Sequence, residues 1–547
     1  MDSLGGSELR ARLLLALFAL ALVAVWLVVD PRTPDLAGAI YRVSLFKQLG
    51  FTIVDEHWYA GHDMPGYSLL FPALGALLGL RLVGALAVLC SCLLFERLTR
   101  PLYGRAATWG TAAFSLAALG DLWSGRVAFA LGVPFALSAL LCLRRGHPLL
   151  AALLAGACAA ASPVAGALLG LAALTLALIE RSPRALLALA VPAALVVLGL
   201  ALLFPEGGQE PYPLLSFLAS SAVAVLFLLA LPRGRGGRAL RLGGAVYLLA
   251  CLACLLVRTP MGSNIERYGV LLAAPLLICA RLAARGAGVG APSPASPRGA
   301  LRSLLALRAG GLAGAAALLT IAVWVAWGPV RETLAVSGTE ATSASYYLPL
   351  ERFLAGHDAR AVRVEVPLTR SHWEAALLAP QVALARGWEK QLEERYDGAL
   401  LSRSLTAASY ERWLHQNAVR FVAAPDAQLD YSAKAEMAMI DKGLPYLHEV
   451  MRSAHWRVYA VSHATPIVQG PATLEAMGPD WLKLDARTPG RVLVHVRFTP
   501  YWELSQGSGC VAPAGQYTRL TLRKPGPARL VTSFSLSRVG STSPRCT

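Results

Sequence analysis

Five ionisable side chains lie close together in the stretch DEHWYAGHDMPGYSLLFP, which covers residues 55–72. They are Asp55, Glu56, His57, His62 and Asp63, and the chain on both sides of them is almost entirely apolar. Ionisable groups beside a membrane-embedded region are costly to hold there, which favours a functional use. This stretch is therefore the first candidate for a site.

Carboxylates and imidazoles provide acid–base and ligand chemistry. Apolar surroundings raise the pKa of a carboxyl group towards neutrality, which suits a base that takes a proton from a hydroxyl group. We predict Asp55 or Glu56 as a general base or metal ligand, and His57 and His62 as donors to a phosphate or as metal ligands. Asp30, at the end of the first apolar segment, is either a further catalytic carboxylate or only the hydrated end of a helix.

Aromatic residues in the same stretch allow a second interpretation. Trp58, Tyr59 and Tyr67 are typical of a loop at the membrane boundary, and in that case the acidic side chains are simply solvated. Asp63 and Tyr67, together with Glu266 further along the chain, are assigned either to acceptor contacts or to loop structure.

Three arginines lie outside the general charge pattern of the chain. Arg126, Arg258 and Arg267 fall in short connections on the side opposite most other arginines. A guanidinium group forms bidentate, charge-assisted bonds with phosphate, so these residues are predicted to hold a phosphate or diphosphate. The alternative is that they form salt bridges that only hold loops together.

Composition places the chain among membrane proteins with several spans. Of its 547 residues 56% are hydrophobic and 15% are charged, whereas soluble domains carry about 25% charged residues. The net charge of +17 comes largely from arginines clustered between apolar segments, which is typical of cytoplasmic loops and argues against nucleic-acid binding. Gly-rich phosphate loops, GxSxG, HExxH and EF-hand patterns do not occur in the sequence.

Apolar segments predict about eleven transmembrane helices, each near or below the usual length of about 20 residues. The predicted spans cover about 13–29, 80–95, 106–122, 127–143, 149–161, 164–179, 185–204, 214–231, 242–257, 268–280 and 310–327. With the N-terminus in the cytoplasm, most arginine clusters fall on the cytoplasmic side, in agreement with the positive-inside rule. An odd number of spans then places everything after Trp327 outside.

The chain after residue 328 has the composition of globular domains. Residues 329–468 mix helical and strand patterns and predict an α/β domain, in which the segment around LPYLHEVMRSA is expected to be helical. Residues 469–547 alternate with period two between Pro/Gly turns and predict a β-sandwich. Cys510 and Cys546 are able to pair if this region is extracytoplasmic. Trp and charged residues near His372 and Trp388 either bind sugars or stabilise the domain.

The chain resembles the GT-C superfamily of membrane glycosyltransferases. An acidic residue closes the first helix, an acidic first outer loop follows, and an extracytoplasmic domain follows the helices. DEHWYAGHDMPGYSLLFP, SGRVAFALG, ASPVAGALLGL and GSNIERYGVLLAAPLL are similar to the actinobacterial 6-pyruvoyl-tetrahydropterin synthase-related integral membrane family. The superfamily resemblance implies a polyprenyl-phosphate-linked sugar donor, a loop carboxylate and, often, a divalent cation such as Mg or Mn.

Carried over by position, the resemblance makes Asp30 or the Asp55–Glu56 pair the base or metal ligand. It makes Arg258 or Arg267 a contact to lipid phosphate. The loop has no strict DxD motif, so Asp55–Glu56 is only an approximate match.

The predicted protein is an inverting glycosyltransferase of the bacterial cytoplasmic membrane, acting at its outer face on a cell-envelope glycan or glycolipid. Its partners are the polyprenyl-phosphate lipid, a glycan acceptor and membrane lipids. A transporter or lipid flippase is one alternative, which predicts charged residues at mid-membrane and inverted repeats. A non-catalytic envelope scaffold is the other.

Overall fold

The computed structural model describes residues 6–232, 235–288, 297–402 and 404–547. It divides the chain into two compact units. The helical unit consists of Met1–Pro31, Ser68–Gly199 and Gln209–Thr333, and the C-terminal unit consists of Arg32–Tyr67, Leu200–Gly208 and Leu334–Thr547. Sequence analysis assigned residues 32–67 and 200–208 to the transmembrane domain, whereas here they belong to the C-terminal unit.

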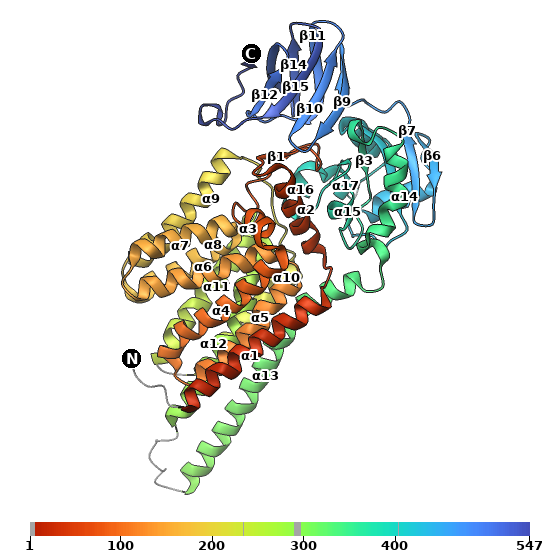
Figure 1. Ribbon diagram of the computed structural model, residues 1–547. Helices are drawn as coiled ribbons and strands as arrows, with labels where there is room; N and C mark the ends of the chain where they lie inside the picture. Colours follow the sequence, from red (N-terminus) through yellow and green to blue (C-terminus); the bar gives the residue numbers. More distant parts are fainter. Residues whose placement is uncertain (1–5, 233–234, 289–296, 403) are drawn as a thin grey trace. The chain divides into compact units, whose positions relative to one another are not determined.

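Apolar helices, most of them long, make up the helical unit, although two of them, 191–203 and 297–336, end within the C-terminal unit (Figure 1). They are α1 (Gly6–Val29), α3 (Phe71–Leu78), α4 (Leu80–Tyr103), α5 (Ala106–Trp123), α6 (Val127–Arg144), α7 (Pro148–Ala161), α8 (Pro163–Glu180), α9 (Val191–Leu203), α10 (Leu214–Ala230), α11 (Arg235–Leu256), α12 (Glu266–Gly288) and α13 (Pro297–Val336). A π-helical turn, Leu186–Ala190, leads directly into α9.

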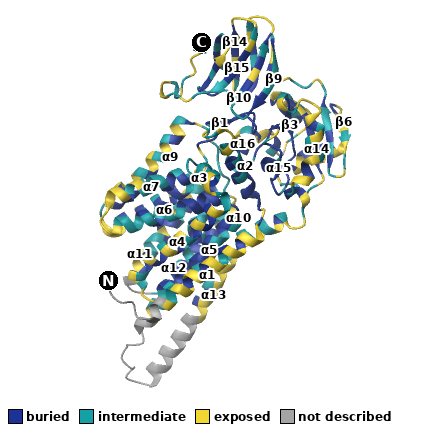
Figure 2. Cartoon of the chain, in the orientation of Figure 1, coloured by how far each residue is buried: buried dark blue, intermediate teal, exposed yellow. Residues whose placement is uncertain are grey.

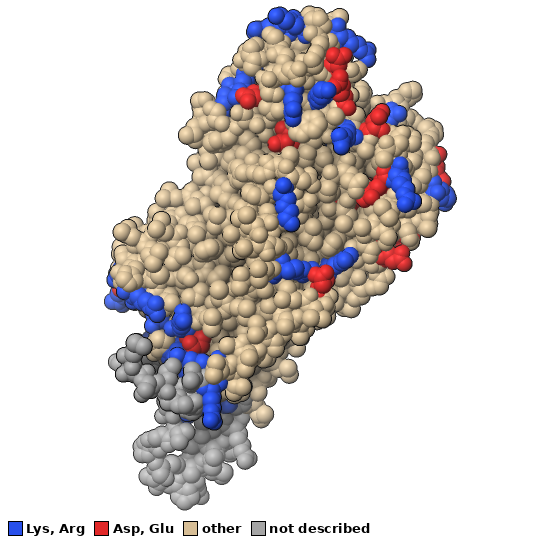
Figure 3. All heavy atoms as spheres, in the orientation of Figure 1, with Lys and Arg blue, Asp and Glu red and all other residues tan. Residues whose placement is uncertain are grey.

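The pattern of burial in this unit is that of a membrane protein. Small residues allow the helices to approach closely: a Cβ atom added to Gly132 would lie 2.5 Å from Cβ of Ala165. Large apolar side chains such as Leu153 and Leu195 are exposed instead. In Figure 2, buried residues gather around α4, α5 and α6, and exposed ones are frequent along α9. On the face drawn in Figure 3, wide areas over these helices carry no charged side chain. An outer surface of this kind is suited to lipid.

Every predicted span coincides with a helix. Within the described residues, eight helices are long and apolar enough to cross a membrane. The other predicted spans correspond to α5, α7 and α10, of which α7 and α10 are shorter apolar helices. The chain is therefore a multi-pass membrane protein, and the number of eleven crossings stays a prediction.

The C-terminal unit begins with α2 (Pro34–Leu49), which is followed by a short hairpin of β1 (Val54–Asp55) and β2 (His62–Asp63). We call residues 54–63 the hairpin segment. Its turn contains three successive residues with positive φ: Tyr59, Ala60 and Gly61. Such a backbone is uncommon outside glycine and requires support from neighbouring structure.

An α/β lobe contains a five-stranded sheet of order β4-β3-β5-β7-β6. The strands β3 (Arg363–Glu365), β4 (Ala383–Leu384) and β5 (Val419–Pro425) are parallel, and β6 (Leu447–Arg452) and β7 (Trp456–Val461) continue the sheet antiparallel. The helices of the lobe are α14 (Ala344–Ala355), α15 (Glu374–Leu377), α16 (Lys390–Tyr396), α17 (Gly398–Leu401), α18 (Ala407–Gln416) and α19 (Lys434–Lys442).

A β-sandwich ends the chain, as predicted. One sheet has the order β12-β15-β10-β9, and the other has the order β16-β13-β14-β11-β8. The strands are β8 (Val468–Gln469), β9 (Ala472–Gly478), β10 (Trp481–Ala486), β11 (Gly490–Arg497), β12 (Trp502–Gln506), β13 (Gly509–Ala514), β14 (Tyr517–Leu522), β15 (Gly526–Thr532) and β16 (Arg545–Cys546). Alternate residues of both sheets, among them Leu484, Val494 and Leu520, share one core. Cys510 and Cys546 form a disulfide.

One local prediction was wrong. The segment LPYLHEVMRSA was expected to be helical, but it contains the strand β6, which pairs with β7. Helix α19 ends at Lys442, and Gly443 after it has φ +84°, which stops the helix. Pairing with β7 then outweighs the local helical pattern.

Candidate functional site

Asp30 is an accessible carboxylate in the helical unit. It follows the last residue of α1, has φ +48°, and its side chain is 51% exposed. Its carboxylate forms an ion pair with Arg81 at the start of α4. The Arg81 guanidinium also lies 4.7 Å from the ring of Trp26, which fixes its direction. The Arg81 guanidinium thus holds the Asp30 carboxylate, which remains accessible to solvent.

A second carboxylate–arginine pair belongs to the same unit. Asp121, near the end of α5, is buried, and its Oδ1 lies 3.2 Å from Nη1 of Arg126, just before α6. Asp121 also lines a small recess together with Phe129. The guanidinium of Arg267, at the start of α12, lies 5.0 Å from the ring of Phe129. Of the predicted phosphate-binding residues, Arg126 thus lies at the start of α6 and Arg267 at the start of α12.

Arg258 and Glu266 complete the predicted set in the helical unit. Arg258 is exposed in the connection after α11, and Glu266 is half-buried as the first residue of α12. The remaining predicted residues, Asp55, Glu56, His57, His62, Asp63 and Tyr67, all belong to the C-terminal unit.

Asp55 is fully buried and well supplied with partners. It accepts hydrogen bonds from the Tyr41 hydroxyl at 2.9 Å and from the His57 backbone N–H at 3.0 Å. The Nε2 atom of His62 lies 3.5 Å from its Oδ2. Burial by itself raises the pKa of Asp55, but the facing His62 outweighs burial and holds that pKa below its ordinary value. The same contact raises the pKa of His62 although its burial opposes this.

Glu56 is buried without a hydrogen bond to either carboxylate oxygen. Burial raises its pKa well above the ordinary value, and the positive charges of Arg363 and Arg497 oppose that shift. The neighbouring backbone is close: a Cβ atom on Gly61 would lie 2.6 Å from Oε1 of Glu56. An acceptor hydroxyl would reach Glu56 or Asp55 only if the hairpin segment moved.

The hairpin segment joins several parts of the C-terminal unit through backbone bonds. Leu384 of β4 donates its N–H to the His57 carbonyl at 2.8 Å. On the sandwich side, Glu56 donates its N–H to the Pro479 carbonyl at 2.6 Å, and Arg497 donates its N–H to the Ala60 carbonyl at 2.7 Å. The segment is thus a junction between the α/β lobe and the β-sandwich.

The two histidines and Asp63 have distinct surroundings. His57 Nδ1 lies 2.6 Å from the Ala379 carbonyl oxygen, so this nitrogen is the donor. Asp63 donates its backbone N–H to the Glu206 carboxylate, which also accepts from the Tyr396 hydroxyl. Burial, followed by the nearby charge of Glu206, raises the pKa of Asp63 to about 8. Tyr67 is half-buried, with the Arg42 guanidinium 4.0 Å from its ring.

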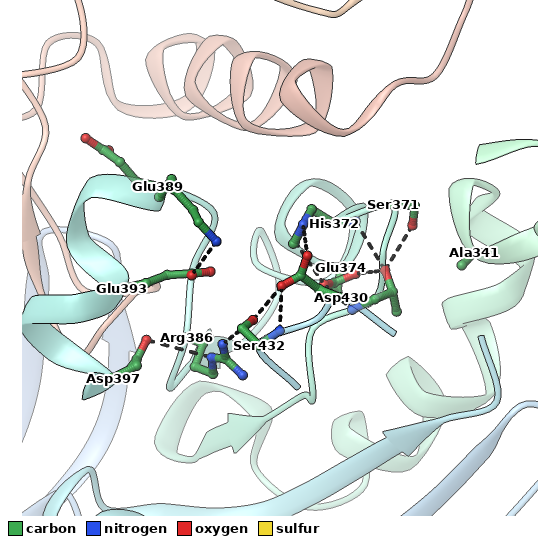
Figure 4. Close-up of polar contacts among 12 residues, drawn as sticks. Ala341, Ser371, His372, Glu374, Arg386, Glu389, Glu393, Asp397, Asp430 and Ser432 are labelled. Carbon is green, nitrogen blue, oxygen red and sulfur yellow. Dashed lines mark hydrogen bonds and ion pairs between the residues drawn. The ribbon is translucent and has the colours of Figure 1, made fainter. Parts of the chain in front are cut away.

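A further polar cluster follows the carboxyl ends of the parallel strands β3, β4 and β5, the edge where open α/β sheets commonly bind ligands (Figure 4). His372 stacks on Trp388 with ring centroids 3.5 Å apart, and its Nε2 lies 3.7 Å from Asp430. Ser432 donates to Asp430 at 2.6 Å and accepts from Arg386 at 3.0 Å.

Buried carboxylates surround the arginine of this cluster. Arg386 lies 3.3 Å from Glu436, 3.8 Å from Asp397 and 4.0 Å from Glu365, all of them buried. Burial raises the pKa of Asp397 to about 7, and Arg386 opposes that shift. With these side chains closed off from solvent, the cluster fits a structural role, the alternative that sequence analysis left open for His372 and Trp388.

The predicted metal site was tested on its donor atoms. Within the described residues, no group of three or more His, Cys, Asp or Glu side chains comes together in a way that could hold a metal ion. Asp55 instead accepts from Tyr41 and His57, and Glu56 stands beside Arg363 and Arg497. Asp55 and Glu56 therefore do not fit a cation site in this arrangement.

Several residues of these arrangements could not be identified from the sequence. Arg81 lies at the start of the second predicted span, and Glu206, Arg363 and Arg497 belong to no motif in the sequence. Their partners in the chain are between 51 and 441 residues away. Of these contacts, only the ion pair of Arg81 has a feature visible in the sequence, which is an arginine at the start of an apolar segment.

Comparison with known proteins bears on the fold. No protein-family model matches the sequence, and no curated protein is similar to it. The single-particle cryo-EM structure of the arabinofuranosyltransferase AftD from Mycobacteria is similar, with a TM-score of 0.50 and 14% sequence identity. The similarity covers 99% of this chain and 58% of that one, so this chain spans less than two thirds of its neighbour. The similarity shows that the chain shares its fold with that structure.

Proposed function

We propose that this protein is a membrane glycosyltransferase that uses a polyprenyl-phosphate-linked sugar to extend a cell-envelope glycan or glycolipid. The observation that carries the proposal is the fold similarity to an arabinofuranosyltransferase along 99% of the chain. A fold alone does not define an activity, so the residues of the site must support it. The narrower relation to the actinobacterial family named above rests on sequence motifs and stays part of this proposal.

The reaction is placed at the extracytoplasmic face of the bacterial cytoplasmic membrane. Arginines such as Arg100, Arg144 and Arg184 lie near helix ends and in the connections on one side, which the positive-inside rule assigns to the cytoplasm. The disulfide between Cys510 and Cys546 supports an oxidising compartment for the C-terminal unit. Asp30 follows α1 at the end opposite its basic N-terminal residues, which gives it the outer side.

Asp30 is proposed as the general base because it is the predicted carboxylate that an acceptor is able to reach. Its carboxylate takes the proton of the acceptor hydroxyl, and the hydroxyl oxygen forms a bond to the anomeric carbon. The bond from that carbon to the lipid phosphate breaks, and the phosphate leaves with the electron pair. One displacement inverts the anomeric centre.

The lipid phosphate would be held by arginine. Arg126 and Arg267 stand at helix starts in the helical unit, and Arg258 lies exposed nearby in sequence. A guanidinium group stabilises the charge that develops on the leaving phosphate. Arg81, paired with Asp30, would keep the base correctly oriented. Asp55 and Glu56 are given a structural role, because both are buried at the junction described above.

The test compares two matched variants of the full chain. Asp30→Asn removes the proposed base, and Asp441→Asn alters a control carboxylate that is 52% exposed and paired with Arg457. Purified protein in detergent would be offered radiolabelled polyprenyl-phosphate arabinofuranose, with other polyprenyl-phosphate sugars in parallel. We expect Asp30→Asn to lower the transfer rate on the order of 10²- to 10⁴-fold, as for loss of a general base, and Asp441→Asn to leave it unchanged.

Equal transfer by the two variants would contradict the role of Asp30. If the wild-type protein transferred none of the sugars while the chain still supported normal envelope glycans, the scaffold alternative would replace the enzyme. Movement of labelled lipid across vesicles without transfer would favour a flippase instead.

A further inference from the structure

Three aromatic rings meet at the last turn of α9. Phe204, directly after the helix, lies 5.6 Å from the ring of Tyr501 and 5.8 Å from the ring of Phe534. The rings of Tyr501 and Phe534 are themselves 5.3 Å apart. Tyr501 precedes β12 and Phe534 follows β15, so the cluster attaches the β-sandwich to the end of an apolar helix.

A hydrogen bond strengthens this attachment. The Tyr501 hydroxyl donates to the carbonyl of Leu203, the last residue of α9, at 2.5 Å. The last carbonyls of a helix have no partner within it, and near hydrocarbon such a group needs one from elsewhere. Tyr501 supplies that partner from the sandwich.

The loop that carries Phe534 is fixed in place. We call residues 533–539 the sandwich loop. Its Ser533 N–H donates to the Tyr501 carbonyl at 2.9 Å, and Arg538 Nε donates to the Pro500 carbonyl at 3.3 Å. The serines at positions 535 and 537 share a hydrogen bond of 2.8 Å. Satisfied hydroxyl groups lower the cost of placing this loop in an apolar medium.

Two large apolar side chains of this fixed loop are nevertheless exposed. Phe534 is 45% exposed and Leu536 is 73% exposed. Leu202, in the last turn of α9, is 72% exposed and belongs to a stretch apolar and long enough to cross a membrane, Leu186–Leu203. Apolar side chains held outward at the end of such a helix continue its lipid-facing surface.

We propose that the sandwich loop inserts Phe534 and Leu536 into the lipid boundary of the membrane. The partner is the bilayer itself, because the loop packs on the residues where the apolar helix ends and its exposed side chains extend that surface. An aromatic ring with an aliphatic neighbour suits this boundary region. The inference stands independently of the proposed transferase activity, and it gives the β-sandwich a direct contact with lipid.

The test places one environment-sensitive fluorophore at a time in the full chain. The seven free cysteines are first replaced and the Cys510–Cys546 disulfide is kept. A label is then attached at Leu536→Cys, at Leu202→Cys as the positive control, or at Val450→Cys, which is 47% exposed on β6 and serves as the negative control. The protein is reconstituted in phosphatidylcholine–phosphatidylglycerol vesicles with or without nitroxide-labelled lipid.

We expect the nitroxide lipid to remove most of the fluorescence at position 536, as at 202, and none at 450. Iodide in the buffer should give the opposite order. The proposal fails if position 536 behaves like 450 in both measurements. Protection of position 536 from iodide only in native membranes, without lipid quenching, would point to a protein partner and would also overturn the proposal.

Discussion

Two pairs of ionisable groups follow each other along the hairpin segment. His62 faces Asp55, and the contact lowers the pKa of Asp55 and raises the pKa of His62, so it favours the imidazolium and carboxylate forms. Asp63, the next residue, faces Glu206 instead, so two like charges would meet if both ionised. The positive charges of His62 and Arg395 oppose the rise in the pKa of Asp63 but do not cancel it. Asp63 therefore keeps its proton at neutral pH.

The raised pKa of Asp63 gives a pH-dependent prediction. A carboxyl group with a folded-state pKa of about 8, against an ordinary value of 3.8, binds a proton on folding, so stability falls as pH rises between these values. Asp63→Asn removes this loss. We expect the variant to be more stable than wild type at pH 8 by about 1–2 kcal/mol, after allowance for screening.

The measurement is the apparent unfolding temperature of the full chain in detergent at pH 5 and pH 8. The expected gain corresponds to roughly 2–4 °C per kcal/mol for a unit of this size. At pH 5 the difference between variant and wild type should be small, because Asp63 is then protonated in wild type. A difference of the same size at both pH values would show that it does not come from this titration.

The density of ionisable residues in this segment was visible in the sequence, but their state was not. Asp55 and Asp63 have the same side chain, yet one faces His62 and the other faces Glu206, which is 143 residues further on. Only the fold decides which partner each carboxylate meets. Asp55 and Glu56 are buried by contacts with residues beyond 360. Periodicity in the sequence predicts local elements and does not show which distant residues they contact.

At the scale of elements, the hairpin segment is held against the loop after β4. The indole of Trp58 is fully buried, and its ring stacks on Tyr41 with centroids 4.6 Å apart. A Cβ atom added to Gly387 would lie 2.6 Å from Cγ of Trp58. The close approach of these two segments therefore depends on a glycine at position 387.

Gly387→Ala should loosen this junction. The new methyl group overlaps a ring that cannot move into solvent, and overpacking of this kind costs about 1–3 kcal/mol. Gly398→Ala is the matched control, because a Cβ atom there has no heavy atom within 4 Å and φ is not positive at either glycine. Hydrogen exchange of the full chain should show faster exchange of the Leu384 amide, which bonds to His57, only in Gly387→Ala. Unchanged exchange in that variant would contradict the junction.

Elements with a strong apolar pattern could be predicted, and those that depend on pairing could not. The spans and the alternating strands β10, β11 and β14 follow from local pattern. Strand β6 has an exposed outer face and was mistaken for a helix, since its structure comes from pairing with β7. Helix α2 lies in the first outer loop and was not predicted. Its apolar residues pack within the C-terminal unit, so they do not form the continuous apolar segment that marks a membrane span.

At the scale of the whole molecule, contacts within the helical unit define its two ends. At one end Arg144 donates to the Leu98 carbonyl at 2.7 Å, and Arg281 donates to the Ala230 carbonyl at 2.7 Å. These contacts bring together the ends of α4 and α6, and those of α10 and α12. Cys279 of α12 lies 3.9 Å from the Ala106 carbonyl of α5, which links the two groups.

The opposite end of the unit is defined in the same way. Asp30 after α1 pairs with Arg81 at the start of α4, and Trp123 at the end of α5 donates to Thr333 of α13 at 2.9 Å. Glu210 donates its N–H to the Thr259 carbonyl at 3.0 Å, which joins the connections that precede α10 and α12. Helices α5 and α10 therefore run between the two ends, and α7 is expected to do the same, although none of the three is among the eight clear spans.

This arrangement predicts eleven crossings and termini on opposite sides of the membrane, whereas eight crossings would leave both termini on one side. Arginines concentrate at the end where α4, α6 and α12 finish, so that end is expected in the cytoplasm. Alkaline phosphatase requires disulfides and is active only outside the cytoplasm. Fused after Thr547 it should therefore be active, and fused after Arg145 it should be inactive, with green fluorescent protein giving the reverse. An active Arg145 fusion or an inactive Thr547 fusion would mean that at least one of α5, α7 and α10 fails to cross. An inactive Thr547 fusion would also place the β-sandwich on the side opposite Asp30.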